Sequence, residues 1–179
     1  MKRLFATTAF ALAAMAGATA SAKDCAGIAG TGWPAMKGYT IGAIAGGPDC
    51  QKAVALIVVR DADGNAVYHE SYIAEYVMTL AGAQTSSELT KALQEWIDAS
   101  DPQFKTTADL PEWKTGEDQP MLGEFAFYPE EGMDRDSYEK LRAAKTPVFS
   151  YVQGMESVAV ITVDPEAGVI KIGAQSFPG

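Results

Sequence analysis

The sequence predicts an α+β fold, with a mainly antiparallel sheet of about five to six strands and two to three helices packed on one side of it. Three observations support this prediction. Residues 53–59 carry no polar side chain, and their β-branched content favours a strand covered on both faces. Two later segments have helical spacing of apolar residues. Three short strand-like segments separated by turn residues then close the chain.

A hairpin is predicted directly after the first apolar strand. Residues 60–65 read RDADGN, and the Asp-Gly step followed by Asn suits a tight turn that needs positive φ. We therefore expect residues 67–72 to return antiparallel beside residues 53–59.

The clearest helix is predicted to begin at Thr85. Thr85 and Glu88 have the spacing of a capping box. The apolar stripe that follows consists of Leu89, Ala92, Leu93, Trp96 and Ile97, and Asp101-Pro102 should end the helix. We also expect a short helix over residues 73–80, and a third after a second capping box formed by Asp136 and Glu139.

The last third of the chain predicts strands. Residues 124–128 alternate as an edge strand does, and residues 147–153, 157–163 and 168–175 should form an antiparallel meander. The order of a hairpin, helices and a three-stranded meander is similar to that of PAS-like and profilin-like domains. This resemblance implies a topology and no function.

The first part of the mature chain is rich in glycine and contains both cysteines. We interpret residues 23–52 as an irregular arm with an edge strand at residues 38–44, tethered to a body formed by residues 53–179. Cys25 and Cys50 should form a disulfide, because an even cysteine count in an exported chain favours one. A metal or redox pair would need closer spacing or further ligands that this chain lacks.

An export signal is predicted at the N-terminus. Residues 1–22 begin with Lys2 and Arg3, continue with an alanine-rich apolar run and end in Ala-Ser-Ala. We expect cleavage before Lys23 and a single exported domain over residues 23–179. The apolar run is too short to span a bilayer, so we expect a soluble periplasmic or secreted protein with no membrane insertion after cleavage.

The charge balance excludes some partners. The chain has 14 basic and 23 acidic residues, and removal of Lys2 and Arg3 leaves 12 against 23, a net charge of −11. Such a surface repels phosphate, so we expect neither nucleic acid nor anionic membrane as a partner.

Residues 100–122 form a long segment in which three prolines prevent a regular element. Irregular loops of this length are often binding loops. Trp113 and Phe104 in it are candidates for contact with a ligand or partner, although the same rings could pin the loop to the body.

Signs of catalytic chemistry are few. His69 is the only histidine, which excludes a multi-histidine metal site, and no nucleotide-binding or nucleophile motif is present. We therefore expect no metal and no cofactor. His69 remains a candidate for ligand contact or, with a partner in space, for a general base.

These observations favour a non-enzymatic exported protein that binds a protein or small ligand. The alternative is a small extracytoplasmic hydrolase or lyase that uses His69 with carboxylates such as Asp61, Glu70 and Glu156. The sequence leaves the choice open and leans towards binding.

Overall fold

The structure, a computed structural model, describes residues 24–98 and 104–177. The predicted signal peptide, residues 1–22, and the predicted helix end at Asp101-Pro102 lie outside these ranges. In chain order the elements are β1 (Cys25–Gly32), β2 (Thr40–Gly47), β3 (Val54–Arg60), β4 (Ala66–Ile73), the 3₁₀ turn η1 (Ala74–Tyr76), α1 (Ser86–Asp98), the 3₁₀ turn η2 (Thr107–Asp109), β5 (Met121–Leu122), β6 (Phe125–Pro129), α2 (Arg135–Ala144), β7 (Val148–Val152), β8 (Ser157–Asp164) and β9 (Gly168–Ser176).

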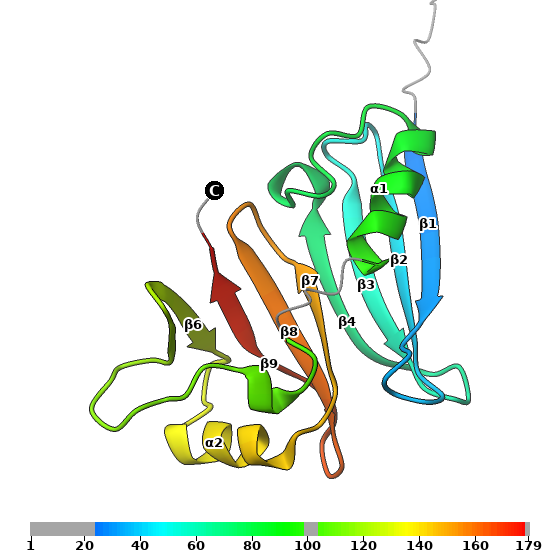
Figure 1. Cartoon of the computed structure of the whole chain (residues 1–179). Coiled ribbons are helices and arrows are strands. Elements are labelled where there is room, and N and C mark those ends of the chain that lie inside the picture. Colours follow the sequence, from blue (N-terminus) through cyan, green and yellow to red (C-terminus); the bar gives the residue numbers. More distant parts are fainter. Residues whose placement is uncertain (1–23, 99–103, 178–179) are drawn as a thin grey trace, which may run out of the picture.

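The strands form two antiparallel sheets rather than one (Figure 1). The N-terminal sheet has the order β1-β2-β3-β4, and the C-terminal sheet has the order β5-β6-β9-β8-β7. The α+β class with mainly antiparallel sheet is confirmed, while the PAS-like or profilin-like topology is not. The helices also do not share one side: α1 lies on the N-terminal sheet, and α2 lies beneath the C-terminal sheet (Figure 1).

The glycine-rich segment is not an irregular arm. It forms the hairpin of β1 and β2, with a continuous register from Cys25 opposite Gly47 to Gly32 opposite Thr40. Its alternation is hard to recognise because both faces carry small residues. Gly27 is required by packing, since a Cβ there would lie 2.9 Å from Oγ1 of Thr90 on α1.

The predicted hairpin of β3 and β4 is confirmed. The Asp61 carboxylate accepts the backbone N–H groups of Asp63 and Asn65, and Gly64 supplies φ of 83°. The prediction that β3 is covered on both faces fails at the start of the strand, where Val54 remains 45% exposed, although Val58 on the same face is only 9% exposed. One side of this sheet is therefore open.

The helix α1 is capped as predicted. The Thr85 N–H donates to the Glu88 carboxylate, and the Glu88 N–H donates to Oγ1 of Thr85. Its buried residues are Leu89, Leu93, Trp96 and Ile97. The Trp96 Nε1–H donates to the carbonyl of Val152 at 2.6 Å, which joins α1 to the C-terminal sheet.

The predicted helix over residues 73–80 is wrong. Only the 3₁₀ turn η1 forms, because the backbone of Val77 is extended (φ −109°, ψ 115°) and the Met78 N–H donates to the carbonyl of Gly154 instead of continuing a helix. The apolar spacing arises from side chains that anchor this turn.

The helix α2 begins earlier than predicted. Asp134 is the N-cap, and its carboxylate accepts the N–H of Ser137 at 2.8 Å. The capping box expected from Asp136 and Glu139 is therefore wrong. The N-terminal cap lies two residues upstream of the predicted one.

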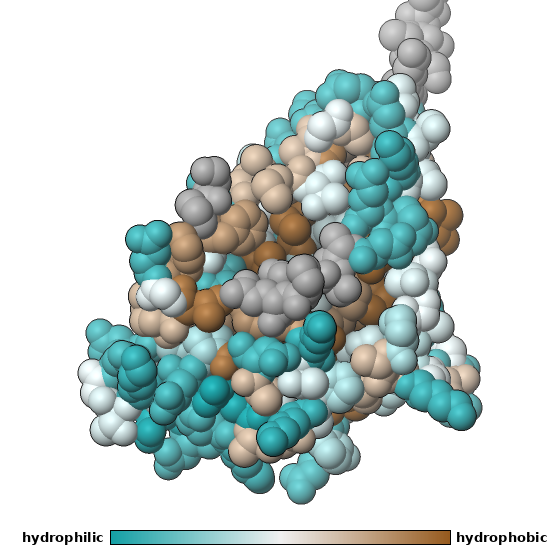
Figure 2. Space-filling model, in the orientation of Figure 1, coloured by the Kyte–Doolittle hydropathy of each residue, from teal (hydrophilic) through white to brown (hydrophobic). Residues whose placement is uncertain are grey.

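The C-terminal meander of β7, β8 and β9 is confirmed. The strand β6 is not the edge, since it pairs with both β9 and the two-residue β5. One face of this sheet packs under α2, and its residues Phe127, Val160 and Ile172 lie in that core together with Tyr138 of α2. Hydrophobic residues also gather between α1 and the C-terminal sheet, whereas α1 itself is largely hydrophilic on its visible side (Figure 2).

The predicted disulfide is present. Cys25 and Cys50 are bonded, with their Cα atoms 5.0 Å apart. Both are buried, so the bond fastens the start of β1 beneath the segment that leads into β3.

Candidate docking surface

The N-terminal sheet has one covered and one open face. We define the outer face as the even-numbered residues of β1, β2 and β3 together with the odd-numbered residues of β4. The opposite face packs against α1 and the C-terminal sheet, and its residues Ile41, Ala43, Ala55, Ile57 and Val59 are all buried. No described element covers the outer face.

Large aliphatic side chains are exposed on this outer face. Ile28 is 67% exposed, and Val54, Ile44 and Ile73 are 45%, 39% and 36% exposed. Single exposed apolar residues are ordinary on protein surfaces, but contiguous apolar patches on a monomer usually mark an interaction site. Here the exposed residues lie side by side on one sheet.

The outer face differs in charge from the rest of the molecule. The whole chain has 23 acidic residues, yet none stands at any outer-face position, all of which the structure describes. Arg60 and His69 are the only basic side chains there. A surface without carboxylates within a strongly acidic chain favours contact with another protein surface over exposure to solvent.

Four glycines on the outer face are not required by any close contact among the described residues. A Cβ at Gly32 or Gly46 would meet nothing within 4 Å, and at Gly30 and Gly42 the nearest atoms lie 3.8 Å away. None of the four has positive φ. Glycine weakens a strand and often marks the close approach of another backbone, and these positions leave room for such an approach to the face.

The glycines create a shallow depression of about 500 Å³ on this sheet. Its outer-face lining consists of Ile28, Gly30, Gly32, Thr40, Gly42, Ile44, Val58 and Arg60. Aliphatic ridges therefore stand directly beside a hollow, which is a shape suited to interdigitation with another apolar surface.

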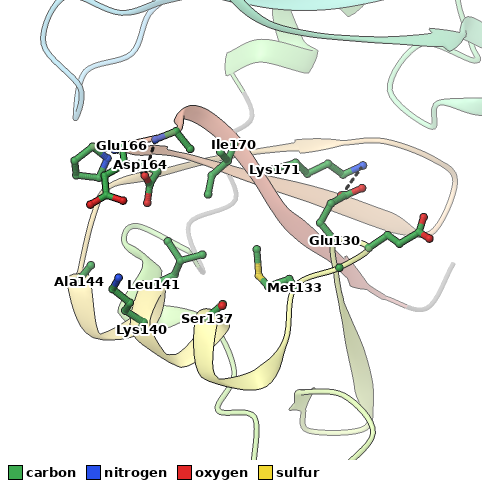
Figure 3. A pocket seen from close by; sticks show the side chains of 14 residues that line it. Glu130, Met133, Ser137, Lys140, Leu141, Ala144, Asp164, Glu166, Ile170 and Lys171 are labelled. Atoms are coloured by element: carbon green, nitrogen blue, oxygen red, sulfur yellow. Dashed lines mark hydrogen bonds and ion pairs between the residues drawn. The ribbon is translucent and has the colours of Figure 1, made fainter.

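A second candidate is the cleft between α2 and the β8–β9 hairpin, with a volume of about 750 Å³. Met133 and Leu141 point from the α2 side towards Ile170 on β9 (Figure 3). These side chains form an apolar floor beneath a rim of charged residues. The cleft could hold an amphipathic molecule.

Three charged groups of this cleft, Asp164, Lys171 and Glu130, already have partners. The Asp164 carboxylate accepts backbone N–H groups of its own turn, and these bonds hold its pKa below the usual range. The Lys171 ammonium lies 3.3 Å from the Glu70 carboxylate. It also lies 3.5 Å from the carboxylate of Glu130 (Figure 3). The cleft thus has fewer unexplained features than the outer face.

Glu70 belongs to a polar network between the two sheets. The Tyr72 hydroxyl donates to the Glu70 carboxylate at 2.6 Å and lies 3.1 Å from the Tyr151 hydroxyl. The Tyr68 hydroxyl lies 3.0 Å from that of Tyr151. Burial raises the pKa of all three tyrosines well above their ordinary range. Glu70 and these tyrosines therefore join β4 to β7 and β9.

The structure does not bring together the residues of the enzymatic alternative. His69 lies exposed on the outer face, whereas Glu70 points to the opposite face of β4. Asp61 lies in the β3–β4 turn and Glu156 in the β7–β8 turn. Within residues 24–98 and 104–177, the His69 side chain makes no hydrogen bond or ion pair. The structure therefore does not assemble His69, Asp61, Glu70 and Glu156 into one site.

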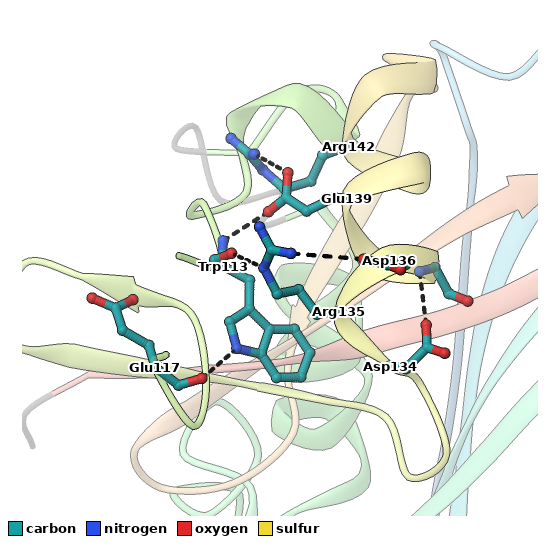
Figure 4. Close-up of polar contacts among 8 residues, drawn as sticks. Trp113, Glu117, Asp134, Arg135, Asp136, Glu139 and Arg142 are labelled. Atoms are coloured by element: carbon teal, nitrogen blue, oxygen red, sulfur yellow. Dashed lines mark hydrogen bonds and ion pairs between the residues drawn. The ribbon is translucent and has the colours of Figure 1, made fainter. Parts of the chain in front are cut away.

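Trp113 packs on α2 (Figure 4). Its backbone N–H donates to the Glu139 carboxylate at 2.7 Å, and its Nε1–H donates to the carbonyl of Glu117 at 2.9 Å. The Arg135 Nε–H donates to the Trp113 carbonyl, and the indole ring meets the Tyr138 ring edge-on. The half-buried ring pins the long loop to the helix. Its predicted binding role stays a prediction.

Phe104, the other aromatic candidate in the long loop, is only 2% exposed. It packs in the core beneath α2, so its ring is not available at the surface of the folded chain. Of the three residues singled out from the sequence, His69 alone lies on the outer face. The other outer-face residues went unnoticed, although Gly and Ile at alternate positions of residues 28–30 and 42–44 are a signal that could have revealed them.

Comparisons with protein-family models, curated proteins and solved structures find no match. In the described part of the chain, no helix is long and apolar enough to cross a membrane. Nor do the described residues contain a group of three or more His, Cys, Asp or Glu side chains placed to hold a metal ion. The surface properties of the fold are thus the basis for a functional assignment.

Proposed function

We propose that this protein is a non-enzymatic extracytoplasmic accessory protein that docks a protein partner on the outer face of its N-terminal sheet. The observation that carries the proposal is an open, carboxylate-free aliphatic face on a chain of net charge −9. Interfaces are depleted of charged residues at their centre, as this face is.

The energetics support a docking role. Covering an exposed Ile or Val side chain completely contributes up to about 1.5 to 3 kcal/mol. Ile28, Ile44, Val54 and Ile73 together offer several kcal/mol to a complementary partner. The free chain gains nothing from leaving them in water.

The compartment is part of the proposal. The buried Cys25–Cys50 disulfide fits an oxidising environment, and disulfides are rare in the cytosol. The predicted signal over residues 1–22 agrees with export to the periplasm or medium.

A photo-crosslinking experiment tests the docking function. A photoreactive amino acid replaces Val54 on the outer face, and the protein is irradiated in the cells that make it. The matched control carries the same amino acid at Lys91, whose side chain is 79% exposed on α1. We expect a discrete adduct from position 54 and none from position 91.

The adduct from position 54 should also disappear when Ile28 is replaced by Asp, because a carboxylate on the face would have to be desolvated on docking. Adducts of equal yield from both positions, or none from either, would contradict a docking face. The mass of the adduct reports whether the partner is a second copy or another chain.

A further inference from the structure

We infer that the partner on the outer face is a second copy of this chain, stacked face to face about a two-fold axis that crosses the strands. This inference rests on the proposed docking function and specifies its occupant. Two adjacent rows of outer-face residues carry it, because their sizes are complementary to each other.

The strand registers define the rows. Ile28 pairs with Ile44, Ile44 with Leu56, and Leu56 with Ser71; two residues along the strands, Gly30 pairs with Gly42, Gly42 with Val58, and Val58 with His69. The first row therefore runs Ile, Ile, Leu, Ser, and the second runs Gly, Gly, Val, His. Each column holds one larger and one smaller residue.

A two-fold axis midway between the rows superposes the first row of one copy on the second row of the other. Ile28 and Ile44 of one copy then enter the hollow over Gly30 and Gly42 of the other, and His69 lies over Ser71. Both halves of such an isologous contact are satisfied at once. The depression of about 500 Å³ between these residues is the socket for the isoleucines.

The charges are compatible with self-association. Two acidic chains repel each other, but the outer face brings no Asp or Glu into the contact. The row that contains Arg60 and the row that contains Val54 lie on opposite sides of the axis, at equal distances from it. Arg60 of one copy therefore lies over the Val54 row of the other. The two Arg60 side chains are therefore not opposed.

The available area reaches the size of a specific interface. Four strands of seven to eight residues present a face of roughly 19 by 26 Å, or about 500 Å². Stacking two such faces would remove about 1,000 Å² from water, which is the lower bound for a specific protein–protein interface. The absent side chains at the glycines let the sheets approach closely over this area.

Sedimentation velocity of the purified, disulfide-intact protein tests this arrangement. We expect a concentration-dependent dimer for the wild type. Gly42→Ile fills the socket and should raise the dimer dissociation constant by about 100-fold, since overpacking blocks approach. Ile44→Gly removes a ridge and should raise it by at least about tenfold.

The double variant Gly42→Ile with Ile44→Gly exchanges ridge and socket within one copy. Because the axis relates the two positions, the exchanged rows remain complementary, and the dissociation constant should return to within about tenfold of the wild type. Gly82→Val is the matched control, since a Cβ at Gly82 meets nothing within 4 Å and Gly82 lies away from the face. It should dimerise as the wild type does.

A wild type that stays monomeric at millimolar concentration would overturn the second-copy inference. So would a folded Gly42→Ile variant with unchanged dimer affinity, which would point to pairing through the β1 edge instead. If near-ultraviolet circular dichroism shows that Gly42→Ile does not fold, Gly30→Val is measured in its place. The same rise in the dimer dissociation constant is expected for it, and an unchanged affinity would overturn the inference. A monomer that still forms a crosslink from position 54 to a different chain would leave the docking function standing and refute only self-association.

Discussion

The two sheets of this protein are covered to different extents. The C-terminal sheet packs under α2 on one face and against α1 and the N-terminal sheet on the other. The N-terminal sheet has α1 and the C-terminal sheet on one face only. Both sheets nevertheless have large aliphatic residues on each face. The difference shows that the outer face is built like a core surface that lacks its second layer.

The glycines of the β1–β2 hairpin differ between the covered face and the outer face. Gly27 faces α1, and a Cβ there would be too close to Thr90. Gly42 faces outward, and a Cβ there would make only ordinary contacts. The first glycine is explained by a neighbour in the chain. The second has no close neighbour among the described residues, which is the space that the proposed partner would fill.

The largest loss of stability is expected from a substitution on the covered face of the N-terminal sheet. Leu93→Ala on α1 removes a fully buried side chain from between the helix and the sheet. We expect a loss of about 2 to 5 kcal/mol in the free energy of unfolding, measured by urea denaturation. A loss under about 1 kcal/mol would contradict the packing of α1 on this sheet.

The disulfide tests how firmly the glycine-rich hairpin is held. Reduction of the Cys25–Cys50 bond should lower the free energy of unfolding by about 2 to 4 kcal/mol. The bond joins residues 25 positions apart, so its loss gives the unfolded chain more conformational entropy. Urea denaturation with and without reductant measures this. The intact mass of the native protein should be two hydrogens below the free-thiol formula. Two titratable thiols in the native protein would refute the bond.

A pair of identical substitutions on β3 compares the two faces directly. Val59 is fully buried on the covered face, and Val54 is 45% exposed on the outer face. Val59→Thr buries a hydroxyl and should cost about 1 to 3 kcal/mol. Val54→Thr should change the stability of the monomer by less than about 0.5 kcal/mol. Equal losses in thermal or urea unfolding at low protein concentration would mean that the outer face is covered within the chain.

The polar network between the sheets predicts alkaline instability. Burial raises the pKa of Tyr68, Tyr72 and Tyr151 in the folded state, so the unfolded chain releases these protons first. Their contribution to stability is present below about pH 10 and is lost as the pH rises above that value. Tyrosinate absorbance should therefore show these groups titrating only together with unfolding. Reversible titration of all seven tyrosines in the folded protein would contradict the network.

Local interactions made much of the fold predictable from the sequence. The β3–β4 turn depends on Asp61, Gly64 and Asn65, and the start of α1 depends on Thr85 and Glu88. Each of these features is fixed by hydrogen bonds between residues at most four positions apart. The cysteine pair and the C-terminal meander also followed from composition and spacing.

The tertiary structure alone decided how many sheets form and which face stays open. Alternating apolar and polar residues reveal which face of a strand is covered only when the other face is polar. The strand β3 is apolar on both faces, so its sequence does not show which face is open. The small residues of β1 and β2 hid their period in the same way. Whether Ile28 and Ile44 are core or surface depends on where α1 and the C-terminal sheet pack, and those contacts join residues far apart in the chain. The socket over Gly30 and Gly42 exists because strand pairing sets two glycines side by side between aliphatic neighbours.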